Sequence, residues 1–294
     1  MRTVYLMIGL LAASAPNTQN LRDLTPRIVA HLQSVSGRFA VGVYDLQKND
    51  SLYINPDTLF HAASTMKTPV MIEVFKQARE GKFRLEDKLT VKNVFHSIVD
   101  GSTFSLDAGD DSDSIMYKRL GSSMSIRNLM VHMITVSSNL ATNLLIELVG
   151  AKHVMETMRS LGTNNLRVLR GVEDGKAFRQ GLNNVVTARD LVMVFRSIGL
   201  NKIVDRAACE EMITILSGQK FKEIIPALLP RGTKVAHKTG SITGVEHDAG
   251  IVYLPNGRSY VVVFLSKNVT DSKAAKRTMA EVSKLLYDYF SKGN

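Results

Sequence analysis

The segment AGIVYLPNGRSYVVVFLS, residues 249–266, determines the class of fold. It contains two runs rich in β-branched residues, 249–254 and 258–266, and each predicts a strand. Pro255-Asn256-Gly257 lies between the runs, and an Asn-Gly pair in that position is a strong signal for a tight hairpin. Because a hairpin joins antiparallel strands, we do not expect a mainly parallel sheet.

Further strands are predicted toward both ends of the chain. Residues 38–45 (RFAVGVYD) and 51–54 predict a second hairpin around the turn residues 48–50, and residues 234–238 predict another strand. From about residue 65 to residue 226 the apolar residues recur at helical spacing, and no strand is expected there.

This order of elements predicts an α+β fold. We expect one antiparallel sheet built from both termini and flanked by helices, with an inserted all-helical domain. An amphipathic helix is predicted over residues 272–290. Residues 20–64 and 228–294 are assigned to the α/β half, and residues 65–227 to the helical half of the same catalytic unit.

The composition argues against several classes of protein. The 294 residues carry a net charge of +10, but the basic residues are scattered and only 6% of residues are aromatic, so no nucleic-acid partner is expected. The single cysteine, Cys209, excludes an internal disulfide and is expected in the core. The seven histidines lack metal-ligand spacing and no Gly-rich phosphate loop is present, so we expect neither metal nor cofactor. Among these histidines, His247 is of interest because it lies next to Asp248.

The N-terminus has the order of a secretory signal peptide. Arg2 precedes an apolar run, 4–13, and small residues follow it. We expect residues 1–14 to be removed by cleavage after Ser14, and the protein to be exported to the periplasm or secreted. The run is too short to span a bilayer and no cysteine follows it, so no membrane anchor is expected. The alternative is a buried N-terminal helix.

Ser64-Thr65-Met66-Lys67 is the first candidate for catalytic chemistry. A serine and a lysine three residues apart lie on one face of a helix, where a lysine of lowered pKa can take the proton of the hydroxyl. Ser217-Gly218-Gln219-Lys220 matches the same spacing, so this pattern alone does not identify the nucleophile.

Two later motifs distinguish between these serines. Ser137-Ser138-Asn139 opens a predicted helix, and Lys238-Thr239-Gly240-Ser241 ends a predicted strand. In the order S-x-x-K, S-x-N and K-T-G, the three motifs resemble those of the class A serine β-lactamases and of the penicillin-recognising serine hydrolases in general. The resemblance extends from about Leu21 to the C-terminus.

The resemblance implies a role for each matching residue. Ser64 would be the acylated nucleophile, Lys67 would accept its proton, and Ser137 would protonate the leaving nitrogen. Asn139 would hold the side-chain amide of the substrate, while Lys238 and Thr239 would bind its carboxylate. The backbone amides of Ser64 and Ser241 would form the oxyanion hole.

The segment expected to serve deacylation departs from the pattern of the family. Hydrolytic members have a glutamate two residues after an arginine, whereas Arg170-Gly171-Val172-Glu173 is one residue longer. Glu173 is the predicted base for the deacylating water, with Asp174 as its competitor. Asn183-Asn184 replace the aspartate that usually pins this loop, and Ala177 stands where an asparagine is usual.

Other departures affect the rest of the predicted cleft. Ser138 replaces the aspartate of the middle motif, and Asp248-Ala249-Gly250 occupy the stretch where an arginine usually helps to hold the substrate carboxylate. The insertion 94–114 is expected at the rim of the cleft. Its acidic part, 107–114, lacks the glycine and glutamate of a calcium loop and is interpreted as a surface loop.

Three functions follow from the motifs. The first is an exported β-lactamase, a monomer that opens the β-lactam ring through a Ser64 acyl-enzyme. The second is a penicillin-binding D-alanyl-D-alanine peptidase or an esterase-like hydrolase acting on cell-wall peptide. The third is a sensor that is acylated by β-lactams and deacylates slowly. Glu173 favours hydrolysis, because a peptidase of this family has no use for it.

Overall fold

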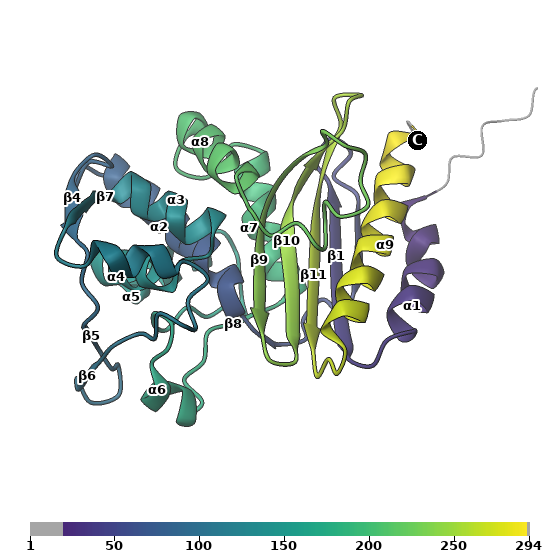
Figure 1. Ribbon diagram of the computed structural model, residues 1–294. Helices are drawn as coiled ribbons and strands as arrows, with labels where there is room; N and C mark the ends of the chain where they lie inside the picture. Colours follow the sequence, from purple (N-terminus) through teal and green to yellow (C-terminus); the bar gives the residue numbers. More distant parts are fainter. Residues whose placement is uncertain (1–19, 293–294) are drawn as a thin grey trace, which may run out of the picture.

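A five-stranded antiparallel sheet forms the centre of the molecule in the computed structural model, which describes residues 20–292 (Figure 1). The predicted signal peptide, 1–14, lies outside the described residues. The strands run in the order β2-β1-β11-β10-β9. Their bounds are β1 Arg38–Asp45, β2 Ser51–Ile54, β9 Lys234–Ile242, β10 Val245–Tyr253 and β11 Ser259–Lys267.

The two ends of the chain meet in this sheet. Strand β1 pairs with β11 along its whole length, from Arg38 opposite Lys267 to Asp45 opposite Tyr260. The predicted hairpin is present as β10 and β11. An antiparallel sheet built from both termini and flanked by helices confirms the predicted α+β fold.

Helices cover both faces of the sheet, which explains its continuous apolar runs. On one face α1 (Thr25–Gln33) and α9 (Ser272–Ser291) lie side by side (Figure 1). Alternate strand residues, such as Val262 and Phe264, pack in the core beneath these two helices. Their neighbours Val261 and Val263 belong to a larger core that continues into the helical half.

The helical half packs on the other face through α7, which contacts β1 and β11. Each α-helix start that carries a side-chain cap uses Ser, Thr or Asp, which are among the residues preferred at that position. Ser125 caps α3, Ser138 caps α4 and Thr187 caps α7. The helices of this half are α2 Lys67–Arg79, α3 Ile126–Thr135, α4 Asn139–Val149, α5 Ala151–Ser160, α6 Gly175–Arg179, α7 Ala188–Gly199 and α8 Arg206–Ser217.

The expectation of no strand between residues 65 and 226 was wrong. Three short ladders are present, and each has strands of only two or three residues, too short for a pattern of alternation to appear in the sequence. The pairs are β3 (Phe60–His61) with β8 (Val185–Val186), β4 (Lys88–Thr90) with β7 (Ser123–Ser125), and β5 (Phe95–His96) with β6 (Thr103–Phe104).

Strands β9 and β10 extend further than predicted. The expected ranges were 234–238 and 249–254, but the strands continue toward each other to Ile242 and Val245. The added residues are largely polar, and their pairing runs from Thr239 opposite Asp248 to the end of the ladder. Three 3₁₀ helices complete the secondary structure of the described residues: η1 Leu21–Leu24, η2 Ala63–Met66 and η3 Ser114–Arg119. Within residues 20–292, no helix is both long and apolar enough to cross a bilayer.

Candidate active site

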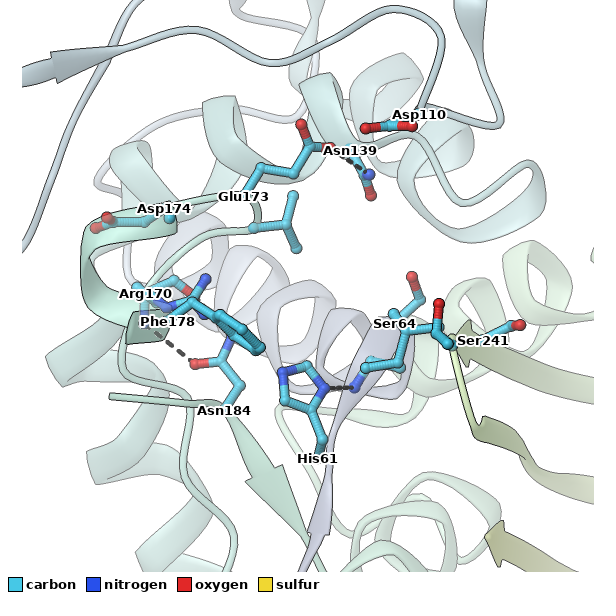
Figure 2. Close-up of a pocket in the computed structure, with 15 residues that line it drawn as sticks. His61, Ser64, Asp110, Asn139, Arg170, Glu173, Asp174, Phe178, Asn184 and Ser241 are labelled. Atoms are coloured by element: carbon cyan, nitrogen blue, oxygen red, sulfur yellow. Dashed lines mark hydrogen bonds between the residues drawn. The ribbon is translucent and has the colours of Figure 1, made fainter. Parts of the chain in front are cut away.

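Two adjoining cavities, of about 530 and 350 Å³, lie between the helical half and strand β9. Both are lined by Ser64, Asn139 and Ser241, and also by Asp110 from the predicted insertion. Figure 2 shows Ser64 and Ser241 across the first cavity from Asn139 and Glu173. The insertion therefore does reach the rim of the cleft.

Ser64 lies in the 3₁₀ turn η2, which leads directly into α2. The preceding residue, Ala63, has a φ of +44°, in the left-handed region that L-residues rarely adopt. Strand β9 approaches this turn so closely that a Cβ on Gly240 would lie 3.1 Å from the backbone nitrogen of Ser64. Glycine at position 240 thus allows the amide of Ser64 and the neighbouring Ser241 to line one site.

Lys67 is fully buried, one helical turn after Ser64. Its ammonium donates to the Ser137 carbonyl at 2.7 Å, to Asn139 Oδ1 at 2.8 Å and to Ser137 Oγ at 3.2 Å. Burial lowers the pKa of Lys67 to about 7. A substantial fraction of this amine is therefore neutral at neutral pH, as a proton acceptor must be.

Ser137 connects the two buried lysines. Lys238 donates to Ser137 Oγ at 3.0 Å and to the Thr239 carbonyl at 2.9 Å. Ser137 itself has a φ of +60°, which turns its side chain between α3 and α4. Burial, and then the nearby charge of Lys67, hold the pKa of Lys238 well below its usual range. One residue from each of the three motifs therefore meets at the Ser137 hydroxyl: Lys67, Ser137 itself and Lys238.

Glu173 faces the first cavity from the loop that precedes α6. Its Oε1 accepts from the Asn139 amide at 2.7 Å and its Oε2 from the backbone N–H of Asp107 at 3.3 Å. Burial raises the pKa of this half-buried carboxyl, although both hydrogen bonds act in the opposite direction. Asn139 thus joins Glu173 to Lys67, because its amide nitrogen binds one and its oxygen the other.

Amide side chains pin the loop that carries Glu173. Asn143 brackets Val172, accepting from its N–H at 2.7 Å and donating to its carbonyl at 3.0 Å. Asn184 donates to the Arg170 carbonyl at 2.9 Å, and Asn183 accepts from the guanidinium of Arg170 at 3.3 Å. The two asparagines therefore supply, as neutral groups, the anchoring that the resemblance assigns to an aspartate.

Asp174, the competitor of Glu173, has a structural position. Its carboxylate caps α6 by accepting from the Ala177 N–H at 3.0 Å, and it also accepts from Ser97 Oγ at 2.9 Å and the Ile98 N–H at 3.0 Å. Both oxygens are thus engaged in joining α6 to the insertion. This geometry favours Glu173 over Asp174 as the base.

Two other candidates lie in structural positions. Ser217 donates to the Ile213 carbonyl at 2.7 Å near the end of α8, and it does not line either cavity. His247 borders the second cavity but is fully buried and bonds the His61 carbonyl at 2.9 Å, and burial lowers its pKa to about 4. Cys209 is buried, as predicted. Among residues 20–292, no group of three or more His, Cys, Asp or Glu side chains is arranged to hold a metal ion.

A model of the beta-lactamase enzyme family matches residues 23–290. The chain belongs to this family. Beta-lactamase VEB-1 of Pseudomonas aeruginosa is 20% identical over 305 residues, which cover 98% of this chain and 97% of that protein. Extended-spectrum beta-lactamase PER-1 of the same organism is 24% identical, over 92% of this chain and 87% of that protein.

Solved structures of beta-lactamases and penicillin-binding proteins share the fold of this family member. The beta-lactamase of Sphaerobacter thermophilus DSM 20745 has a TM-score of 0.77 at 24% identity, covering 89% of this chain and 95% of that chain. PBP-A has a TM-score of 0.76 at 26% identity, covering 94% of this chain and 99% of that chain.

Sequence reasoning missed two residues at the site of this beta-lactamase-family protein. Lys276 of α9 lines the second cavity, as do Thr239 and Ser241, and its ammonium lies 3.6 Å from Glu246. The segment 107–114 is a surface loop, as interpreted, but Asp111 within it is buried and accepts from the backbone N–H of Asn139. Neither residue belongs to a local motif, so tertiary packing alone places both.

Proposed function

We propose that the protein is an exported serine β-lactamase of class A type that hydrolyses the ring amide through an acyl-enzyme on Ser64. The observation that carries the proposal is the position of Ser137 Oγ, which accepts from both Lys67 and Lys238. Ser137 lines the second cavity and Glu173 the first, and Ser64 lines both. Acyl transfer needs a nucleophile, a base, a proton donor for the leaving group and a route to water, and these residues supply each part.

In acylation, Ser64 Oγ attacks the ring carbonyl and its proton passes to neutral Lys67. The carbonyl oxygen becomes negative and is met by the N–H groups of Ser64 and Ser241. The ring C–N bond then breaks, Ser137 gives its proton to the nitrogen, and Lys67 returns a proton to Ser137. The Ser137 hydroxyl lies within 3.2 Å of the Lys67 amine, as this return requires.

In deacylation, Glu173 removes a proton from a water that attacks the ester carbonyl. The ester C–O bond breaks, and the proton returns to Ser64 Oγ. Two neutral groups, the Asn139 side-chain amide and a backbone N–H, donate hydrogen bonds to Glu173 and hold it in place. Glu173 therefore needs no charged partner for this role. Its raised pKa makes it a stronger base than an exposed glutamate.

A penicillin-binding peptidase is the second candidate, and the likeness to PBP-A favours it. A variant of PBP-A has been solved as its acyl-enzyme complex with penicillin-G, at 25% identity and a TM-score of 0.77. Such a protein shares the machinery for acylation and lacks efficient deacylation. Glu173 in the cavity is the feature that favours the β-lactamase.

The test is hydrolysis of a chromogenic cephalosporin by the purified mature chain, combined with intact-protein mass spectrometry. Sustained turnover supports the β-lactamase, whereas a single stoichiometric burst with a stable adduct supports a penicillin-binding protein or a sensor. Ser64→Ala should abolish both turnover and labelling, while Ser217→Ala, the matched serine of the other S-x-x-K pattern, should change neither. Labelling that persists in Ser64→Ala would contradict the mechanism.

Export is a separate part of the proposal. We expect the mature protein to begin near Ala15, after removal of residues 1–14. N-terminal sequencing of protein recovered from the periplasm or the medium checks this, and recovery of only the full-length chain from the cytoplasm would contradict it.

A further inference from the structure

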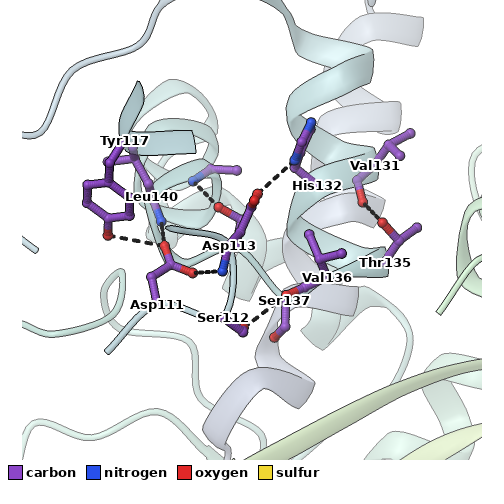
Figure 3. A network of polar contacts seen from close by, with 12 residues as sticks. Asp111, Ser112, Asp113, Tyr117, Val131, His132, Thr135, Val136, Ser137 and Leu140 are labelled. Atoms are coloured by element: carbon purple, nitrogen blue, oxygen red, sulfur yellow. Dashed lines mark hydrogen bonds and ion pairs between the residues drawn. The ribbon is translucent and has the colours of Figure 1, made fainter. Parts of the chain in front are cut away.

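Asp111 is a buried carboxylate at the N-terminus of α4 (Figure 3). Its Oδ2 accepts from the backbone N–H groups of Asn139 and Leu140, each at 2.9 Å, and from the Tyr117 hydroxyl at 3.1 Å. Its Oδ1 accepts from the Asp113 N–H at 3.0 Å. The first two donors belong to the opening turn of a helix, where N–H groups lack partners within the helix and favour a negative charge.

The segment that carries Asp111 is fixed to the turn between α3 and α4. Asp113 Oδ2 lies 2.7 Å from His132 Nδ1 in α3, and Ser112 Oγ donates to the Val136 carbonyl at 2.9 Å. Both contacts come from the two residues that directly follow Asp111, and they hold this segment against the turn that includes Ser137.

The middle motif has no acidic residue of its own. Ser138 occupies the central position, and its hydroxyl accepts only from the Ala141 N–H at 3.2 Å. The negative charge at the start of α4 therefore comes from a segment more than twenty residues earlier in the chain, and not from the motif.

We propose that Asp111 is a positioning residue for the catalytic groups, which holds Asn139 in place at the start of α4 and supplies a negative charge near Lys67. The connection runs from Asp111 to the Asn139 N–H, and from Asn139 Oδ1 to the Lys67 ammonium 2.8 Å away. This inference rests on the proposed function, in which Lys67 must lose and regain a proton.

The charges around Lys67 give the direction of the effect. Asp111 from the insertion and Glu173 from the loop before α6 both raise the pKa of Lys67, against the larger effect of burial. The cation facing this group from β9 is Lys238, which itself lies near Asp248. Neutralising Asp111 removes one of the two stabilising negative charges, so the pKa of Lys67 should fall below its value of about 7.

Asp111→Asn tests the proposal because it removes the charge and retains an oxygen that can accept hydrogen bonds. The Lys67 amine is titrated by NMR in protein labelled at lysine Cε, with Lys67→Arg identifying its signal. We expect a midpoint about one pH unit lower than in the wild type. Asp111→Glu, which keeps the charge, should restore the wild-type midpoint, and Asp111→Ser is a second neutral variant should Asp111→Asn fail to fold.

Two matched controls separate the charge from the structural cap. Ser138→Ala removes a cap of the same helix without changing charge, and Asp113→Asn removes the neighbouring buried carboxylate that bonds His132. Both should leave the Lys67 midpoint within about 0.3 pH units of the wild type, because neither group is among the charges that act on Lys67. A midpoint unchanged in folded neutral variants of Asp111, or lowered equally in the controls, would overturn the proposal.

The acid limb of the pH profile for acylation by benzylpenicillin provides the second readout. It should move to lower pH in Asp111→Asn by the same amount as the Lys67 midpoint, because the neutral amine persists to lower pH. A wild-type chain that is not acylated would contradict the proposed function, yet the NMR titration would still decide the role of Asp111.

Discussion

The ammonium of Lys238 lies 3.0 Å from the hydroxyl oxygen of Ser137. That oxygen also accepts from Lys67 at 3.2 Å, so two buried amines from different halves of the fold share one small acceptor. In so confined a space both amines cannot easily be charged at once, and the hydroxyl offers a path for a proton between them.

Replacing Lys238 by alanine should slow acylation at least tenfold and deacylation less, because its charge acts on the incoming substrate and on Lys67. The loss of a neighbouring cation should also raise the pKa of Lys67, which moves the acid limb of acylation to higher pH. Stopped-flow measurement of both steps checks this. Lys234→Ala, at the exposed start of β9, is the control, and equal losses in both steps would argue against the role.

Glu173→Gln should leave acylation near the wild-type rate and slow deacylation by at least about a hundredfold, so that acyl-enzyme accumulates. As the pH falls, the wild type should lose deacylation at a higher pH than an enzyme whose base has an ordinary carboxylate pKa, because the pKa of Glu173 is raised. Single-turnover kinetics with mass spectrometry measures both effects.

Asp174→Asn is the matched control for Glu173. It should lower the melting temperature slightly, because it removes the negative charge at the start of α6 and weakens the hydrogen bond from Ser97, and it should change deacylation by no more than a few-fold. Wild-type turnover in Glu173→Gln together with slow deacylation in Asp174→Asn would mean that Asp174, and not Glu173, is the base.

Lys276→Met should raise KM for penicillins about tenfold with little change in kcat, because Lys276 is a cation beside Thr239 and Ser241, where the substrate carboxylate is proposed to bind. Lys276→Arg should retain the wild-type KM. Lys273→Met, one turn earlier on α9 and outside this cavity, should have no effect. An unchanged KM in Lys276→Met would mean that this cation does not contact the substrate.

The stability of the protein should depend on pH through His247. Its pKa is lowered from about 6.5 to about 4 in the folded chain, so the unfolded chain binds more protons between these values. The free energy of unfolding should therefore decrease as pH falls from 6.5 to 4, by about 3 kcal/mol in total. Urea unfolding at several pH values measures this, and in His247→Gln the decrease should be smaller by that amount.

Short sequence patterns were sufficient to predict those elements whose residues lie close together in the sequence. The hairpin at residues 249–266 and the helix that starts at Asn139 are present, and the three motifs meet at one site. Each depends on residues close in sequence, or on a resemblance carried by short motifs.

The remaining features depend on contacts between distant segments. Asp111 reaches Asn139 and Lys276 reaches the cavity only because of how the insertion and α9 pack, and no periodicity encodes either contact. The polar ends of β9 and β10 are extended because each pairs with the other, although their residues have weak strand preference on their own. At the site, contacts between distant segments therefore outweighed the local conformational preferences of the residues.

The pairing of β1 with β11 has a consequence for the synthesis of the protein. Strand β1 can pair early with β2 on one edge, but its other edge must wait for β11 near the C-terminus. Gly240 comes against Ser64 only when β9 has also been made. Contacts of such long sequence separation make folding slow and leave an incomplete chain without its central sheet. The central sheet therefore stays incomplete until almost the whole chain has been translated, whereas the helices of residues 67–217 are made before β9 begins.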